Sequence, residues 1–114
     1  MNRILTAIAA VLSLALIGAV VFASRASSNE AHRLVEAGAH LVDVRTPEEY
    51  AAGHLPGAVN IPVDQIAARR EDVGPLDEPV VVYCHSGRRS GLAAAQLKAA
   101  GFQSVYDLGA MSSW

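Results

Sequence analysis

Residues 80–101 read VVVYCHSGRRSGLAAAQLKAAG, and the architecture of the chain follows from this segment. Its first four residues, 80–83, are all apolar and mostly β-branched, which is typical of a strand covered on both faces in a parallel sheet. Residues 90–100 are rich in Ala and Leu and stop at Gly101, which indicates a helix. A buried strand, a polar loop and a helix in this order predict an α/β fold.

Strands and helices alternate on both sides of this segment. Two capping boxes, Ser27 with Glu30 and Thr46 with Glu49, each predict the start of a helix. The expected helices are 27–37, 47–52, 63–70 and 90–100, and the expected strands are 41–44, 58–61, 80–83 and 105–107. No strand is expected before the first helix. The pattern predicts a small parallel β-sheet flanked by helices, with ligands at the carboxyl ends of its strands.

The first two dozen residues are almost entirely apolar. Arg3 precedes an apolar run from Ile4 to Ala23, and small residues offer cleavage sites after Ala23 and after Ala26. The run of 20 residues is also long enough to cross a membrane as a helix. We therefore assign residues 1–26 to a signal peptide or an uncleaved signal anchor. The protein is expected to be exported, in the periplasm or on the extracytoplasmic face of the membrane, touching the membrane only through an uncleaved leader.

The body after this leader is acidic. From Ser27 onward, seven Lys and Arg residues stand against eleven Asp and Glu residues, a formal charge of −4. Nucleic acids bind basic surfaces, so this balance argues against nucleic acid as a partner. A chain of 114 residues has room for one modest domain, and we expect a monomer with a single site.

Cys84 is the only cysteine of the chain, so it cannot form an intramolecular disulfide. It follows the central strand and precedes a helix N-terminus, where backbone N–H groups converge into a cradle for anions. A helix N-terminus and nearby cations lower the pKa of a thiol and favour the nucleophilic thiolate, and Arg88 and Arg89 are such cations. An inert buried cysteine is the alternative, but the Gly, Arg and Ser residues that follow favour a reactive thiol.

Three segments of the body resemble signatures of the rhodanese family. The loop from Cys84 to Ser90 resembles the active-site loop of that family. The two flanking signatures are LVDVRTPEEY with GHLPGAVNIP at 41–50 and 53–62, and the last segment at 101–114. The three segments occur in the expected order, so the resemblance implies a rhodanese-like domain over residues 29–114.

This resemblance implies a thiosulfate sulfurtransferase that needs no cofactor. Cys84 would take a sulfur atom from a small-molecule donor such as thiosulfate, hold it as a persulfide, and pass it to cyanide or a thiol. Gly87 would let the loop curl around the sulfur, and Arg88 or Arg89 would steer the anionic donor. The substrate-binding residues expected on this basis are His85, Ser86, Gly87, Arg88, Arg89 and Ser90.

Other polar residues are interpreted as structural. Asp43 and Arg45 flank a strand end, where an ion pair or loop anchor is expected, and His54 is interpreted as a turn residue. His32 and His40 lie far in sequence from other candidate ligands, and a single cysteine leaves no spaced ligand set for zinc. No metal is therefore expected.

Two other functions are compatible with the Cys84 loop. A cysteine-dependent phosphatase or arsenate reductase would use the same thiolate, but typically places its binding arginine six residues after the cysteine. Here Arg89 is the fifth residue and Ser90 the sixth, and this smaller loop suits a sulfur atom better than a phosphoryl group. A non-enzymatic sulfur carrier or binding module with the same fold is the second alternative. Loss of the cysteine would normally mark such a module, and Cys84 is present.

Overall fold

The computed structural model describes residues 24–114. The apolar run of the predicted leader, which ends at Ala23, lies outside the described residues. Between residues 24 and 114, no helix is both long and apolar enough to cross a membrane.

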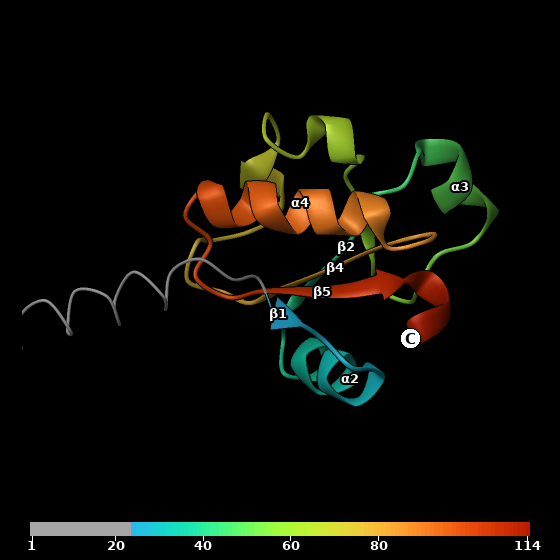
Figure 1. The fold of residues 1–114 in the computed structure, drawn as a ribbon, viewed down its shortest axis with the longest axis horizontal. Coiled ribbons are helices and arrows are strands. Elements are labelled where there is room, and N and C mark those ends of the chain that lie inside the picture. Colours follow the sequence, from blue (N-terminus) through green and yellow to red (C-terminus); the bar gives the residue numbers. More distant parts are fainter. Residues whose placement is uncertain (1–23) are drawn as a thin grey trace, which may run out of the picture.

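A single sheet of five parallel strands forms the centre of the molecule (Figure 1). The strand order is β1-β5-β4-β2-β3. The strands are β1 (Ser24–Arg25), β2 (His40–Asp43), β3 (Val59–Asn60), β4 (Val80–Cys84) and β5 (Val105–Ala110). All five residues of β4 are buried between β2 and β5. The predicted parallel sheet around this strand is confirmed.

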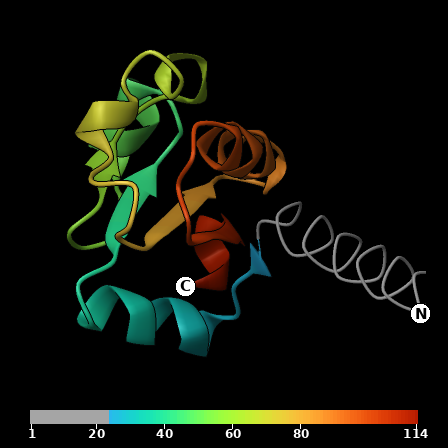
Figure 2. The same ribbon diagram turned by 90° about the vertical axis from the view of Figure 1, so that its left-hand side faces the viewer.

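Helices cover both faces of the sheet, with α2 on one face and α4 on the other (Figure 2). The helices are α2 (Ser28–Glu36), α3 (Pro47–Ala52) and α4 (Arg88–Ala99), with 3-10 turns η1 (Val63–Gln65), η2 (Arg70–Asp72) and η3 (Met111–Ser113). Alternate residues of β4 enter the two cores, since side chains of a strand point to opposite faces. Val82 and Cys84 pack in the core that includes α4 residues, whereas Val81 and Tyr83 pack in the core beneath α2.

Both predicted capping boxes are present. The Ser27 hydroxyl accepts from the Glu30 N–H of α2, and the Thr46 hydroxyl accepts from the Glu49 N–H of α3. In each pair the glutamate side chain accepts from the backbone N–H of the capping residue. These contacts satisfy N–H groups that a helix start otherwise leaves without partners.

The prediction of a helix over 63–70 is wrong. The segment contains η1 and a turn, and η2 begins only at its last residue. Ile66 is the one fully buried side chain among residues 63–70, so the segment lacks the repeated apolar stripe that would hold a regular helix against the core. The helix expected from residue 90 starts two residues earlier, because Gly87 serves as its N-cap.

The expectation that no strand precedes the first helix is also wrong. Ser24 and Arg25 form β1, which pairs with Tyr106 and Asp107 of β5. The Ala26 N–H extends this pairing with a 3.0 Å hydrogen bond to the Asp107 carbonyl. A strand of two exposed residues has no apolar alternation of its own, and it directly follows the apolar run that ends at Ala23. Residues assigned to the leader thus form one edge of the sheet.

Candidate active site

Cys84 is the last residue of β4, and its side chain lies on the face of the sheet that α4 covers. The loop of His85 and Ser86 leads to Gly87, which has φ 99° and ψ −13°. This left-handed conformation strongly favours glycine. A Cβ on Gly87 would meet the Cα of Gly109 at 3.7 Å, an ordinary contact, so backbone conformation rather than crowding requires the glycine.

The Cys84 sulfur is enclosed by hydrogen-bonding groups of the loop. The Gly87 N–H donates to Sγ at 2.9 Å, and the thiol donates to Ser90 Oγ at 3.4 Å. Ser90 is fully buried, and its hydroxyl donates to the Gly87 carbonyl at 3.1 Å. When the thiol loses its proton, the Ser90 hydroxyl can rotate and donate to the sulfur instead. The site can therefore stabilise a negatively charged sulfur.

These contacts lower the pKa of the Cys84 thiol. Burial raises the pKa of the thiol, but hydrogen bonds from the Ser90 side chain and from the backbone of Ser90, Gly87 and Ser86 outweigh burial. The net result is a thiol pKa below its ordinary value. From the sequence, Arg88 and Arg89 are the cations expected to favour the thiolate. In the structure, the hydrogen bonds of the loop favour it more than these arginines do.

The two arginines of the loop differ in their surroundings. Arg88 is exposed, and it has no ion-pair partner among residues 24–114. Arg89 is half-buried and binds Glu49 of α3 in a bidentate pair, with N–O distances of 2.6 and 3.0 Å. This contact with Arg89, together with the Thr46 N–H, lowers the pKa of Glu49 to about 2. Glu49 is therefore ionised at neutral pH, and the pair is formed there.

The remaining predicted loop residues lie at the surface. His85 and Ser86 are both exposed. Cys84 itself has no exposed surface in this structure, so its sulfur is enclosed by the surrounding residues. The structure thus places all seven predicted site residues in one loop and the first turn of one helix.

Asp43 and Arg45, for which an ion pair or a loop anchor was expected, form an ion pair that is buried. The Arg45 guanidinium donates to Asp43 at 2.7 and 3.0 Å and to the Gly53 carbonyl at 2.6 Å. The contact with Asp43 raises the pKa of Arg45. His54 stacks on Tyr50, and its Nδ1 lies 2.8 Å from the Tyr50 carbonyl. These residues anchor the turn beside the carboxyl end of β2.

Sequence reasoning missed Glu49 as a neighbour of the Cys84 loop. The sequence places Glu49 in a capping box and in one of the family signatures, but nothing in the spacing indicates that Arg89, 40 residues later, lies against it. The signal is topological: β2 and β4 are adjacent and parallel, so the segments after their carboxyl ends meet.

Residues 24–114 contain no group of three or more His, Cys, Asp or Glu side chains that could hold a metal ion.

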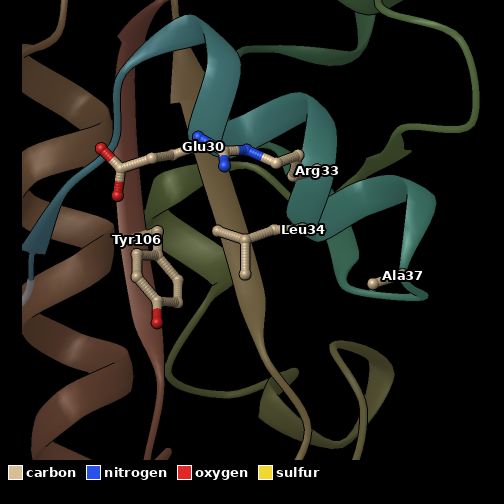
Figure 3. A pocket seen from close by; sticks show the side chains of 5 residues that line it. All are labelled: Glu30, Arg33, Leu34, Ala37 and Tyr106. Carbon is tan, nitrogen blue, oxygen red and sulfur yellow. The ribbon is translucent and has the colours of Figure 1, made fainter.

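A groove lies between α2 and β5, on the sheet face opposite α4 (Figure 3). Glu30, Arg33, Leu34, Ala37 and Tyr106 line this groove, and none of them belongs to the Cys84 loop.

A family model for the rhodanese-like domain matches residues 27–114, which include the whole Cys84 loop. The chain belongs to the rhodanese family. It has the small α/β fold of that family, with a parallel sheet between helices.

Particular relatives are sulfurtransferases by name. The thiosulfate sulfurtransferase GlpE of Pseudomonas paraeruginosa is 41% identical over 95 residues, covering 79% of this chain and 82% of that protein. The thiosulfate sulfurtransferase PspE of Escherichia coli is 38% identical over 78 residues, covering 68% and 75% respectively. The solved structure of a rhodanese with anions from E. coli has a TM-score of 0.64 and 36% identity, over 68% of this chain and 92% of that one.

Proposed function

We propose that this protein is a thiosulfate sulfurtransferase in which Cys84 carries the transferred sulfur as a persulfide. The observation that carries the proposal is the thiol at the end of β4, which accepts the Gly87 N–H at 2.9 Å and has a lowered pKa. Membership of a family with named thiosulfate sulfurtransferases supports it. Mass spectrometry of the purified protein after incubation with thiosulfate tests it.

The reaction divides into two displacements at sulfur. In the first, the Cys84 thiolate attacks the outer sulfur of thiosulfate, the S–S bond of the donor breaks, and sulfite leaves with the bonding electrons. In the second, cyanide or a thiolate attacks the outer sulfur of the persulfide, and the Cys84 thiolate leaves and is restored. Hydrogen bonds from Gly87 and Ser90 stabilise the anionic sulfur before the first step and after the second.

The enclosed position of the sulfur favours small donors and acceptors. Cys84 has no exposed surface, and the N–H of the left-handed Gly87 contacts its sulfur at 2.9 Å. A compact anion such as thiosulfate can reach the outer side of the loop at His85 and Ser86. The phosphatase alternative has less support, because Arg89 is already bound by Glu49 and the sixth residue, Ser90, is buried against the sulfur.

Within residues 24–114, Arg88 is the loop cation without an ion-pair partner, so its charge can meet an anionic donor. Its replacement by Ala is expected to raise the KM for thiosulfate about three- to tenfold, as loss of an exposed charged contact does. The increase should shrink at high salt, where exposed charges are screened. Steady-state kinetics of the Arg88→Ala variant measure it. Arg70→Ala, in η2, removes an exposed arginine away from the loop and should leave KM unchanged. Equal KM values for the two variants would make Arg88 a solvated surface charge only.

We further propose that the leader is cleaved during export and that the mature protein begins at Ser24. Of the two candidate sites, cleavage after Ala23 keeps β1, the Ala26 hydrogen bond and the ion pair of Arg25 with Asp107, whereas cleavage after Ala26 removes all three. N-terminal sequencing of the protein expressed with its full leader should therefore read Ser-Arg-Ala. Membrane-bound material that begins at Met1 would establish an uncleaved anchor instead.

A comparison of two shortened chains tests the same reasoning on stability. A chain that begins at Ser27 should unfold at lower urea concentration than one that begins at Ser24, by about 1–2 kcal/mol for the lost edge pairing. Equal urea midpoints would show that β1 adds nothing, and the preference for the first site would then be unsupported.

A further inference from the structure

The ion pair of Arg89 with Glu49 joins the end of the Cys84 loop, where α4 begins, to α3. Arg89 lies in the first turn of α4, and Glu49 lies in the first turn of α3, at the carboxyl edge of the sheet (Figure 1). The two side chains are 31% and 33% exposed, so the pair is partly shielded yet open to solvent on one side. The bidentate geometry fixes the guanidinium plane as well as its distance.

Glu49 is held in place independently of Arg89. Its Oε1 also accepts the Thr46 N–H at 3.1 Å, and its own N–H donates to the Thr46 hydroxyl at 3.2 Å. The next residue, Tyr50, donates its hydroxyl to the Ala58 carbonyl at 2.7 Å and so ties α3 to the segment before β3. The carboxylate is therefore a fixed negative charge beside the loop rather than a mobile surface group.

Three of the four arginines next to the loop are paired with carboxylates within residues 24–114. The titratable and charged groups on the elements next to it include His85, Arg88 and Arg89 on the loop and α4, Arg45 after β2, Glu48 and Glu49 on α3, and Arg25 and Asp107 from β1 and β5. Asp43 neutralises Arg45, Glu49 neutralises Arg89, and Asp107 pairs with Arg25. Within residues 24–114, Arg88 is the cation at the loop without an ion-pair partner.

We propose that Glu49 is a specificity-determining residue of the Cys84 site that sets how strongly the site prefers anionic over neutral reactants, because it occupies Arg89 and, among the described residues, leaves Arg88 as the loop guanidinium without an ion pair. Two free guanidinium groups on one loop would bind any tetrahedral anion of high charge more tightly, thiosulfate and phosphate alike. A single free guanidinium attracts an anionic sulfur donor more weakly than two would, and it therefore allows the anionic product to leave. The effect of Glu49 on thiosulfate as a substrate rests on the proposed function. Its effect on the charge balance of the loop does not depend on that function.

Alkylation of Cys84 measures this charge balance without any sulfur transfer. Iodoacetamide and iodoacetate both form an S–C bond with the thiolate and release iodide, but only iodoacetate is an anion. The ratio of the two second-order rate constants therefore cancels the thiolate fraction and reports how strongly the site attracts negative charge.

Glu49→Gln is the decisive variant, because glutamine also completes a capping box and so removes the charge while keeping the helix start. The ratio of iodoacetate to iodoacetamide rates should rise about two- to fivefold, the range of partly exposed ion pairs. Glu48→Gln is the matched control, since Glu48 is an exposed carboxylate one residue earlier with no ion pair in the described chain. Its ratio should equal that of the unmodified protein.

Two more variants separate charge from structure. Arg89→Gln should lower the ratio, because it leaves the Glu49 carboxylate unbalanced. The double variant Glu49→Gln with Arg89→Gln should return close to the original ratio, because the pair it removes is neutral. Thermal melts of all variants check folding. An unchanged ratio in Glu49→Gln, or a double variant that keeps the full rise, would overturn the proposal.

Thiosulfate kinetics then test the specificity role. The KM for thiosulfate should fall about two- to fivefold in Glu49→Gln, and inhibition by inorganic phosphate should strengthen by a similar factor. A raised alkylation ratio with unchanged KM and unchanged phosphate inhibition would overturn the specificity role. If the protein never gains sulfur from thiosulfate, the proposed function fails, while the alkylation ratios and the phosphate binding of the variants still decide the role of Glu49.

Discussion

Replacement of Cys84 by Ser is expected to abolish sulfur transfer. The unmodified protein should gain about 32 Da, one sulfur atom, on incubation with thiosulfate, and cyanide should remove this mass as thiocyanate. The Ser variant should gain nothing, and its turnover should fall by at least about a thousandfold, because a hydroxyl at neutral pH is a far weaker nucleophile than a thiolate. Intact-mass spectrometry and a thiocyanate assay measure the two steps.

The same variant also checks that the loss is chemical. Serine is close to cysteine in size, and the Gly87 N–H and Ser90 hydroxyl that contact Sγ can hydrogen-bond an oxygen as well. Its circular dichroism spectrum and melting temperature should therefore stay near those of the parent. A folded Ser variant that still turned thiosulfate over would exclude the persulfide mechanism. A parent protein that never gained sulfur but hydrolysed aryl phosphates would favour the phosphatase alternative.

The central part of the fold could be predicted because its signals are local. Because β4 is buried on both faces, its residues must be apolar on both, and the consecutive Val80, Val81 and Val82 show this directly in the sequence. The capping boxes of α2 and α3 likewise lie within four consecutive residues, so the chain near each helix start fixes its own geometry. The loop at Cys84 belongs to the same class, since strand, loop and helix are contiguous.

The errors concern features that depend on distant partners. β1 has two residues, and it is a strand only because β5 offers an unpaired edge some 80 residues later. The segment at 63–70 has helix-forming residues but a single buried anchor, Ile66, so tertiary packing did not sustain the helix. Local sequence contains neither fact.

The candidate site divides along the same line. The residues that contact the sulfur, Gly87 and Ser90, could be identified from the loop itself. The partner of Arg89 could not, because Glu49 reaches the site from another element. The sequence presented Arg88 and Arg89 as equivalent cations, but of the two only Arg89 has an ion-pair partner among the described residues. A charge count along the chain cannot show this difference, because pairing is set by which strand ends are adjacent.

The second large effect is expected at Arg45, which balances a carboxylate that has no exposed surface. Arg45→Met would leave Asp43 buried with the Arg45 backbone N–H as a remaining donor but no counter-charge. Loss of one partner from a buried ion pair costs about 3–5 kcal/mol, which is a large share of the roughly 5–15 kcal/mol that stabilises a typical domain. The midpoint of urea unfolding should therefore fall sharply.

Arg69→Met provides the matched control, because Arg69 pairs with Asp72 at 2.9 Å on the surface, with side chains 41% and 55% exposed. That exposed pair should contribute less than about 1 kcal/mol, so the two Arg→Met variants compare the loss of a buried ion pair with the loss of an exposed one. Adding Asp43→Leu to Arg45→Met removes the unbalanced charge and should restore part of the lost stability.

At low temperature the folded fraction of Arg45→Met should still load sulfur on Cys84, since Arg45 holds the turn at Gly53 and does not contact Sγ. Equal urea midpoints for Arg45→Met and Arg69→Met would show that the buried pair does not stabilise this fold.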